Sequence, residues 1–371
     1  MTNAPIWGEE DTLTLPTLAG DLEADVCVVG LGGSGLACVR ALVGGGRRVV
    51  GVDVTAVAAG AAGRNGGFLL GGLAMFHHDA VTRFGRRTAV AIYEQTLKHI
   101  DRMVDETPAA IRRSGSLRIA ASADEQDDCA RQFEAMRRDG LPVEVFAGPE
   151  GTGLLFPADA AYDPAARCRA MARDALAAGA RLFAQTPALS IDEGCVTTPS
   201  GCVRARYVVV AVDGRLEMIL PELSSRVRSA RLQMLATAPA RDVEIPRPIY
   251  TRWGLDYWQQ REDGRVVLGG CRDVGGDAEW TTDDHPTETV QAALTSLLRE
   301  RLHVSAAVTH RWAATVAYTQ SGLPILEQVR PRVWAIGAYS GTGNVIGALY
   351  GSAVAELITR GQSEVAELFR A

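Results

Sequence analysis

Lysine is nearly absent from this sequence. Of its 38 lysines and arginines, Lys98 is the only lysine. Mechanisms that need an active-site amine, such as Schiff-base formation, therefore depend on Lys98 or are excluded. Clustered cysteines are also missing: the seven cysteines contain no Cys-x-x-Cys pair and do not gather near the six histidines. This spacing predicts reduced thiols and no metal site.

Long apolar runs are absent as well. The longest, such as residues 207–212, are too short to cross a bilayer, and the first residues lack the basic start and apolar core of a signal peptide. The net charge of −6 argues against a nucleic-acid backbone or an anionic membrane as the main partner. We therefore expect a cytoplasmic protein with no nucleic-acid partner and no membrane span.

What is present is an ordinary globular composition with a βαβ unit near its start. The 371 residues, 47% of them hydrophobic, allow two domains. Residues 25–29 form a continuous apolar run typical of a buried parallel strand, and residues 33–43 have helical spacing. Residues 48–52 predict a second strand, so the segment is about as long as a βαβ unit.

The rest of the chain alternates between two kinds of pattern. Helices are predicted at residues 88–106, 124–139, 164–178, 286–303 and 345–359, whereas short alternating strands from residue 231 predict an antiparallel sheet. The predicted class is α/β, with a Rossmann-like dinucleotide-binding domain (1–85, 150–228 and 310–371) interleaved with an α+β substrate domain built on an antiparallel sheet (86–149 and 229–309).

The sharpest motif is a Gly-x-Gly-x-x-Gly sequence at residues 30–35, between the first strand and the first helix. Gly30 allows a tight turn, Gly32 lets the backbone approach a pyrophosphate, and Gly35 permits close packing of helix on strand. Asp53 ends the second strand, where a carboxylate accepts hydrogen bonds from ribose hydroxyls. The pattern predicts a dinucleotide cofactor; the alternative is a glycine-rich turn beside a solvated acid.

A second glycine-rich segment, residues 60–67, follows the second strand and contains Arg64 and Asn65. With residues 30–35 it resembles the FAD-dependent glycine/D-amino acid oxidase and sarcosine oxidase superfamily, in particular its gamma-glutamylputrescine oxidoreductase-like branch. The resemblance extends nearly end to end, through the strand at 208–212 and a glycine-rich turn at 337–344 before the last helix. It implies that the dinucleotide is FAD and that the first domain is an FAD-binding domain.

The motif and the resemblance together predict the residues that hold FAD. They lie in the two glycine-rich segments, after the second strand, beside the adenine, after the strand at 208–212 and in the last turn. They are Gly30, Gly32, Gly33, Ser34, Gly35, Asp53, Val54, Ala61, Ala62, Arg64, Asn65, Gly66, Gly67, Ala188, Val212, Asp213, Gly341, Thr342, Gly343, Asn344 and Val345.

Three positions depart from the family pattern. Asp213 stands where asparagine is common, and Thr342 replaces the histidine of the last turn. Val316 occupies the position where amino-acid oxidases carry an arginine for the substrate carboxylate and sarcosine oxidases carry a cysteine bonded to the flavin. The resemblance therefore implies non-covalent FAD and no α-carboxylate anchor at that position.

On the substrate side, Tyr257 lies where glycine-oxidase-like members have a tyrosine that faces the substrate carboxylate. The alternative for Tyr257 is a half-buried aromatic on a sheet face. Arg252 and Arg272 lie at the ends of hairpin strands and are candidates for binding an anion, although solvated edge arginines are the commoner case. His77 and His78 follow the flavin segment closely and are candidates for entering the site, although we expect them on a surface loop.

The function that the resemblance implies is dehydrogenation of a C–N bond in an amine or amino acid. Hydride passes to flavin N5, the imine is hydrolysed, and oxygen or another acceptor reoxidises the flavin. The redox chemistry belongs to the cofactor, and the protein supplies orientation and electrostatics. The alternatives are a nicotinamide-dependent dehydrogenase built on the same βαβ unit and an FAD-binding protein with degraded catalysis.

Overall fold

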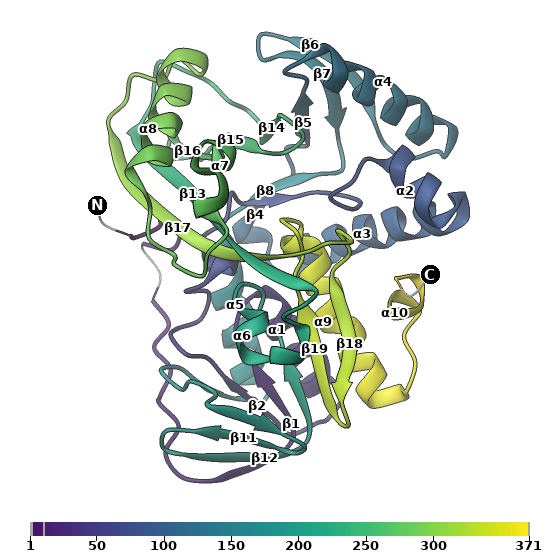
Figure 1. The fold of residues 1–371 in the computed structure, drawn as a ribbon, viewed down its shortest axis with the longest axis vertical. Helices are drawn as coiled ribbons and strands as arrows, with labels where there is room; N and C mark the ends of the chain where they lie inside the picture. The colour runs from purple at the N-terminus through teal and green to yellow at the C-terminus, as the bar shows by residue number, and fades with distance from the viewer. Residues whose placement is uncertain (1–2, 10–11, 370–371) are drawn as a thin grey trace. The chain divides into compact units, whose positions relative to one another are not determined.

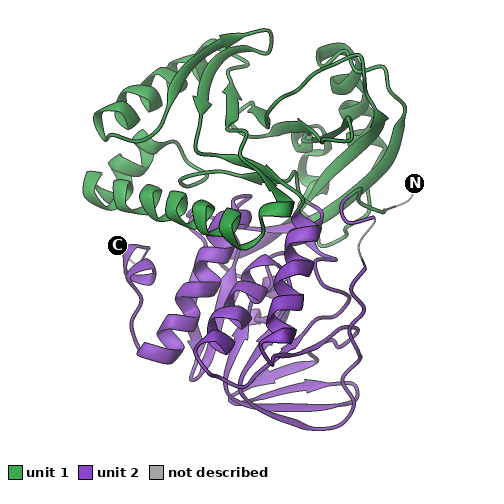
Figure 2. Cartoon of the chain, turned by 180° about the vertical axis from the view of Figure 1, so that it is seen from behind, with its two compact units in different colours: residues 1–6, 65–163, 230–314 green, residues 7–64, 164–229, 315–371 purple. Residues whose placement is uncertain are grey.

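The computed structural model describes residues 3–9 and 12–369, which divide into two compact units (Figures 1 and 2). Unit 1 contains residues 1–6, 65–163 and 230–314, and unit 2 contains residues 7–64, 164–229 and 315–371. Residues 1–2, 10–11 and 370–371, which the sequence assigns to the FAD-binding domain, lie outside the described residues. Among the helices of the described part, none combines the length and the apolar character needed to cross a membrane.

Unit 2 is built on an eight-stranded sheet with a parallel centre. The order is β10-β11-β12-β1-β2-β9; β19 also pairs with β12, and β18 pairs with β19. The pairings that join β9, β2, β1, β12 and β19 are all parallel, which confirms the Rossmann-like prediction. The strands are β1 (Leu22–Val29), β2 (Val49–Val52), β9 (Arg181–Phe183), β10 (Ser190–Asp192), β11 (Cys195–Thr198), β12 (Gly201–Val210), β18 (Ile325–Arg330) and β19 (Val333–Gly337).

The helices of unit 2 include three long ones, each close to a predicted range: α1 (Gly33–Gly44), α5 (Pro164–Ala177) and α9 (Gly343–Arg360). Shorter pieces are α6 (Leu216–Ile219), α10 (Glu364–Leu368) and the 3-10 turns η1 (Ala61–Gly63) and η3 (Pro221–Leu223). The helices α1 and α9 pack backbone to backbone, because a Cβ on Gly351 would lie 2.2 Å from the Ser34 carbonyl oxygen. They follow the parallel strands β1 and β19, so their N-termini lie at the same edge of the sheet.

Unit 1 contains most of a second eight-stranded sheet, in the order β17-β13-β16-β15-β14-β5-β7-β6. The neighbours from β13 to β14 pair antiparallel, as predicted for the chain from residue 231; β5, β7 and β6 also pair antiparallel, and β14 and β5 pair parallel. Both β13 and β17 run from one unit into the other. The strands are β5 (Ser116–Ile119), β6 (Glu144–Gly148), β7 (Gly151–Phe156), β13 (Val227–Pro239), β14 (Ile249–Thr251), β15 (Asp256–Gln260), β16 (Arg265–Gly269) and β17 (Val308–Thr319).

A small three-stranded sheet accounts for the main difference between the units and the sequence-derived boundaries. It joins β3 (Phe68–Leu69), β8 (Ala160–Tyr162) and β4 (Ile111–Arg112), so residues 65–85 and 150–163 belong to unit 1 and not with the Rossmann-like sheet. The helices of unit 1 are α2 (His77–Phe84), α3 (Arg86–Glu106), α4 (Ala123–Arg138), α7 (Arg272–Gly275) and α8 (Glu288–Ser296), with shorter turns η2 (Pro108–Ala110), η4 (Gly276–Glu279) and η5 (Leu297–Arg301).

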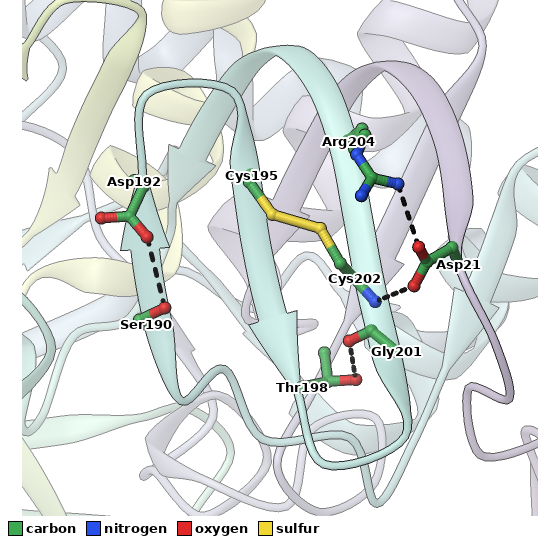
Figure 3. The surroundings of a disulfide bond; sticks show 8 residues. All are labelled: Asp21, Ser190, Asp192, Cys195, Thr198, Gly201, Cys202 and Arg204. Carbon is green, nitrogen blue, oxygen red and sulfur yellow. Dashed lines mark hydrogen bonds and ion pairs between the residues drawn. A yellow bond between two sulfur atoms is a disulfide. The ribbon is translucent and has the colours of Figure 1, made fainter.

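The hairpin of β11 and β12 corrects the prediction that all cysteines are reduced. Cys195 on β11 and Cys202 on β12 form a disulfide, with their Cα atoms 6.5 Å apart (Figure 3). The prediction failed because seven residues of sequence separation bridge a tight antiparallel turn, which brings the two side chains within disulfide reach. The free cysteines of the described chain are all buried: Cys27, Cys38, Cys129, Cys168 and Cys271.

Counting thiols tests this pairing. We expect protein purified and denatured without reductant to take up five alkyl groups, and the same protein after reduction to take up seven, as measured by intact mass. In the control variant Cys195→Ser the partner is released, so all six remaining thiols should react without reduction. Seven reactive thiols in the unreduced wild type would show that the disulfide does not form.

Candidate functional site

The turn between β1 and α1 has the geometry predicted for the first glycine-rich segment. Gly30 has φ +101°, a conformation that favours glycine, and a Cβ there would lie 2.6 Å from the Ala211 carbonyl oxygen. A Cβ on Gly35 would lie only 1.9 Å from the Gly30 carbonyl oxygen. In contrast, nothing in the described chain lies within 4 Å of the place where a Gly33 Cβ would be. The turn is closed toward the sheet and open on its outer side.

Two helices begin at this edge without a side-chain cap. Neither Gly32 before α1 nor Thr342 before α9 provides a side chain that accepts a hydrogen bond from its helix N-terminus. The Thr342 hydroxyl instead donates to the Tyr339 carbonyl oxygen at 2.8 Å. The first N–H groups of a helix have no partner within the helix, and they carry a partial positive charge. The edge therefore offers N–H donors to an anion such as a pyrophosphate.

Asp53 lies at the same edge, directly after β2. Its Oδ2 accepts the Leu31 N–H at 2.8 Å, and its Oδ1 accepts the Thr55 N–H at 2.9 Å and the Thr55 hydroxyl at 3.2 Å. Burial raises the pKa of Asp53, and the hydrogen bonds from Leu31 and Thr55 oppose that rise. A carboxylate has about four acceptor positions, so one remains for a ligand hydroxyl. The side chain thus fixes the turn after Gly30 and retains one acceptor position.

Asp213, which follows β12, connects that strand to β17 and to the segment after β19. Its Oδ1 accepts the Tyr339 N–H at 3.0 Å, and its Oδ2 accepts the Ala317 N–H at 3.3 Å. Burial raises the pKa of Asp213 to about 6 despite these hydrogen bonds. An asparagine has one acceptor oxygen and would turn its NH₂ group toward one of the two donors. This contact explains why aspartate suits a position where the family commonly has asparagine.

The other predicted residues of unit 2 lie around the same edge. Ala61 and Ala62 form η1, and a Cβ on Gly32 would lie 3.1 Å from the Ala62 Cβ, so η1 covers the start of α1. Val212 contacts the Gly30 turn, Ala188 packs on the sheet core, and Val54 is 58% exposed after Asp53. The remaining members are Ser34, in α1; Arg64, after η1; Gly341, before α9; and Gly343, Asn344 and Val345, in its first turn.

The predicted residues Asn65, Gly66 and Gly67 belong to unit 1. The Gly67 N–H donates to the Asn65 side-chain oxygen at 2.9 Å, which tightens the segment. Sequence reasoning missed Gln259 on β15, whose Nε2 donates to the carbonyl oxygens of Gly66 and Gly67 at 2.5 and 2.9 Å. The signal was present: Gln259 lies two residues after Tyr257, so both side chains point to one face of the strand.

Tyr257 lies against the same segment. A Cβ on Gly66 would lie 2.9 Å from its ring, and a Cβ on Gly269 would lie 2.5 Å from it. The ring also contacts Phe68 edge to face, with 6.0 Å between centroids. Tyr257 is half-buried. Glycine at both neighbouring positions makes room for this ring beside the second glycine-rich segment.

The two arginines predicted to meet an anion are already engaged. The Arg252 guanidinium donates to Asp256 at 2.9 Å and to Asp273, and its backbone N–H donates to Glu125 at 3.1 Å. The Arg272 guanidinium lies over the Trp280 ring, 4.8 Å from its centroid. The carboxylates on Arg252 reduce its capacity to bind a further anion.

The expectation for His77 and His78 is wrong, because both begin α2 and do not lie on a surface loop. His77 is buried, and its Nε2 lies 2.8 Å from Asp139 Oδ2, a partner 62 residues away that no local pattern reveals. Both ring nitrogens of His78 are buried without a hydrogen-bond partner in the described chain, and burial lowers its pKa.

Asp159 is a buried acid that ties the chain after the second glycine-rich segment to the large sheet. Its Oδ1 accepts the Gly71 N–H at 2.8 Å, and its Oδ2 accepts the Ser116 hydroxyl at 2.6 Å. Burial raises the pKa of Asp159 to about 7, although both hydrogen bonds and the charge of Arg118 oppose the rise. The folded protein therefore holds this proton more tightly than the unfolded chain, whose aspartates titrate near pH 4.

This pKa predicts a dependence of stability on pH. Because the folded-state pKa exceeds the unfolded value, the contribution of Asp159 is most favourable below about pH 4 and is lost as pH rises through about 7. The free energy of unfolding of wild type minus that of Asp159→Asn should therefore fall by a few kcal/mol between pH 4.5 and 7.5 (about 1.4 kcal/mol per pKa unit). Urea unfolding at four pH values measures this difference.

The control for that experiment is Asp101→Asn, which replaces an aspartate whose side chain is exposed and paired with Arg113. Its difference from the wild type should stay nearly constant over the same range. A constant difference for Asp159→Asn would contradict the raised pKa.

Comparison with known proteins identifies the family to which the chain belongs. The family described as FAD dependent oxidoreductase matches residues 25–357. A probable oxidoreductase, OrdL of Rhizobium meliloti, is 27% identical over 370 residues, which cover 92% of this chain and 84% of the relative. Gamma-glutamylputrescine oxidoreductase of Escherichia coli is 24% identical over 382 residues, covering 95% and 87%.

Solved structures agree on the fold. The crystal structure of glycine oxidase from Geobacillus kaustophilus superimposes with a TM-score of 0.75 at 19% identity, over 92% of this chain and 96% of that one. The match of residues 25–357 covers most of the chain and includes all the predicted FAD-binding residues. This chain belongs to the FAD-dependent oxidoreductase family.

Proposed function

We propose that this protein oxidises a C–N bond of a small amine or amino acid, with oxygen or another acceptor taking the electrons, and that it does so in the cytoplasm. Family membership favours FAD over the nicotinamide alternative. The observation that carries the proposal is the edge of unit 2 where two uncapped helix N-termini and Asp53 lie at the ends of parallel strands. The name of the relative from Escherichia coli supports an amine substrate.

The residues at this edge fit FAD. The open side of the turn at Gly33 leaves space for a pyrophosphate close to the N-terminus of α1, and Asp53 has an acceptor for a ribose hydroxyl. The uncapped N-terminus of α9 would supply N–H donors that stabilise negative charge on the bound group. With Val316 in place of a cysteine, the FAD is held without a covalent bond. When bound, FAD supplies the acceptor for the hydride removed from the substrate carbon.

The chain's own contribution is positioning. Gln259 holds the carbonyl groups of Gly66 and Gly67, and the ring of Tyr257 packs on Gly66, beside the second glycine-rich segment. In this proposal Tyr257 orients the substrate and no side chain acts as a general base, because the amine binds uncharged. Val316 and Thr342 depart from the family pattern. The second candidate, an FAD-binding protein with degraded catalysis, is therefore tested as well.

One prediction of the proposed function concerns Asp53. Asp53→Ala removes three hydrogen bonds that hold the turn after Gly30 and one acceptor for ribose. Each bond to a charged group contributes roughly 1.5–3 kcal/mol, and 1.4 kcal/mol is tenfold, so the Kd for FAD should rise at least tenfold. Titration of the apoprotein with FAD, followed by flavin fluorescence, measures it.

The matched control is Asp25→Ala. Asp25 also accepts a backbone N–H, that of Arg48 at 2.8 Å, but it lies in the middle of β1, four residues before the strand ends at the ligand edge. Its loss should leave the Kd for FAD within twofold of wild type. Equal retention of FAD by the Asp53 and Asp25 variants would place the dinucleotide site elsewhere.

Another prediction of the proposed function concerns the substrate. Because Val316 replaces the arginine that meets an α-carboxylate, a buried carboxylate there has no charged partner, which costs several kcal/mol. Glycine, sarcosine and D-alanine should therefore be poor substrates, and amines with a more distant polar or anionic group should be better. Anaerobic bleaching of the flavin absorbance, followed by steady-state kcat/KM for each amine, tests both function and preference.

Bleaching by none of the amines would favour the FAD-binding protein with degraded catalysis. If D-alanine or sarcosine has the highest kcat/KM, another arginine has taken over the α-carboxylate and the inference from Val316 is wrong.

A further inference from the structure

Unit 1 contains a buried arginine that forms no ion pair with any carboxylate of the described residues. Arg118 on β5 is 8% exposed, and its Nη1 donates to the Gln132 side-chain oxygen at 2.9 Å. Its Nε is buried and has no hydrogen-bond partner in residues 3–9 and 12–369. Within the same residues the guanidinium forms no ion pair. A buried, unpaired charge is costly, so proteins rarely retain one without a use.

The buried acids of the neighbourhood are engaged elsewhere. Glu125 uses both oxygens on backbone N–H groups, those of Ala121, Arg252 and Trp253. Asp159 accepts from Gly71 and Ser116, and its raised pKa of about 7 leaves it partly uncharged at neutral pH. Neither acid forms an ion pair with Arg118, although the charge of Arg118 lowers the pKa of Asp159.

Aromatic rings surround the Arg118 guanidinium. Its guanidinium carbon lies 4.0 Å from the centroid of the Phe76 ring and 4.8 Å from that of Tyr250. Such ring contacts hold a guanidinium flat, but they do not neutralise its charge. His78, whose ring nitrogens also lack hydrogen-bond partners, contacts the same Phe76 ring at 5.4 Å. Carboxylate oxygens of Asp79 and Asp128 lie 3.5 and 3.8 Å from His78 Nε2, whereas no carboxylate of the described residues forms an ion pair with Arg118.

Arg118 also stands in line with the predicted substrate residue. In the sheet register, Tyr257 on β15 is opposite Tyr250 on β14, and Tyr250 is opposite Arg118 on β5. Directly opposed residues point to the same face of a sheet. Two strand spacings separate Arg118 from Tyr257, which is about 10 Å. Tyr257, Tyr250 and Arg118 thus form a row across three strands. Tyr257, at one end of the row, packs against Gly66, and Arg118 lies at the other end.

We propose that Arg118 anchors a carboxylate that the substrate carries several bonds away from its reacting C–N bond. The inference rests on the proposed function for the identity of the reacting bond. It replaces Arg252 and Arg272 as anchors, because carboxylates already engage Arg252 and because Arg272 lies on α7, outside the row of Tyr257, Tyr250 and Arg118. The guanidinium donates two N–H groups to the carboxylate oxygens, and the Tyr250 and Phe76 rings keep it in position.

The binding experiment does not depend on turnover. Holoenzyme is titrated calorimetrically with straight-chain carboxylates from butanoate to octanoate. We expect Arg118→Met to raise the Kd of the tightest-binding carboxylate at least tenfold, and Arg118→Lys, which keeps the charge without the planar fork, to raise it less. The matched control is Arg113→Met, an exposed arginine paired with Asp101 in the same unit, which should change the Kd less than twofold.

The turnover experiment links this site to the reaction. Rates of anaerobic flavin reduction are compared for ω-amino acids from glycine to 8-aminooctanoate and for n-alkylamines of the same length. Wild type should prefer the longer ω-amino acids over their matched alkylamines by at least tenfold in kred/Kd. Arg118→Met should lose this preference without a change in the alkylamine values.

A stability measurement separates binding from a structural role. Replacing an unpaired buried charge by an apolar side chain should leave the Tm of Arg118→Met equal to or above that of wild type. Arg231→Met, which abandons the buried Glu279, should lower it.

Two results would overturn the proposal. One is unchanged carboxylate binding in Arg118→Met, above all with a lowered Tm; the other is loss of carboxylate binding in Arg272→Met or Arg252→Met and not in Arg118→Met. If carboxylates bind through Arg118 but no amine reduces the flavin, the anion site stands and the proposed function fails.

Discussion

The ligand edge of unit 2 depends on one close approach, that of the Gly35 backbone to the Gly30 carbonyl oxygen. A Cβ at residue 35 would lie 1.9 Å from that oxygen, so any other residue forces α1 away from β1. A second approach, of Gly351 to the Ser34 carbonyl oxygen, sets α9 beside α1. Because both helices follow parallel strands, these contacts bring two free helix N-termini to the same edge. The anion-binding character of the edge is thus a consequence of backbone packing.

The parts of the fold that the sequence predicts are those encoded by local pattern. The βαβ unit, α3, α4 and α5 follow from apolar spacing and from glycine and proline at the ends of elements, and the bounds of each lie within three residues of its predicted range. Pairing between distant segments has no such signal. The parallel pairing of β14 with β5 joins residues more than 100 positions apart, and the small sheet of β3, β8 and β4 moves residues 65–85 into unit 1.

The candidate site divides in the same way. Its glycines and Asp53 were predictable because each position answers to a local backbone requirement. Gln259, Asp159 and Arg118 were not assigned a role, because each acts through a partner far along the chain, such as Gly66 for Gln259 and Gly71 for Asp159. The prediction for His77 failed for the same reason, since burial beside Asp139 is a property of the fold and not of the segment. The segment at residues 60–67 also passes from unit 2 to unit 1 after Arg64, so one motif is supported by two separate cores.

Arg118 differs from the arginines of unit 1 that pair with carboxylates. Arg231 gives three of its nitrogens to Glu279, Asp283 and the Ala278 carbonyl oxygen, and Arg252 pairs with Asp256. In these pairs the attraction between the charges offsets the cost of removing them from water, and loss of one partner would leave the other unpaired. Arg118 is about as buried as Arg231, and it receives the Gln132 amide oxygen, a hydrogen bond with the Tyr250 side chain and two ring faces, which compensate much less. An apolar residue at position 118 would avoid the cost of burying that charge. The retention of arginine there is therefore better explained by an anion that arrives with the ligand than by packing.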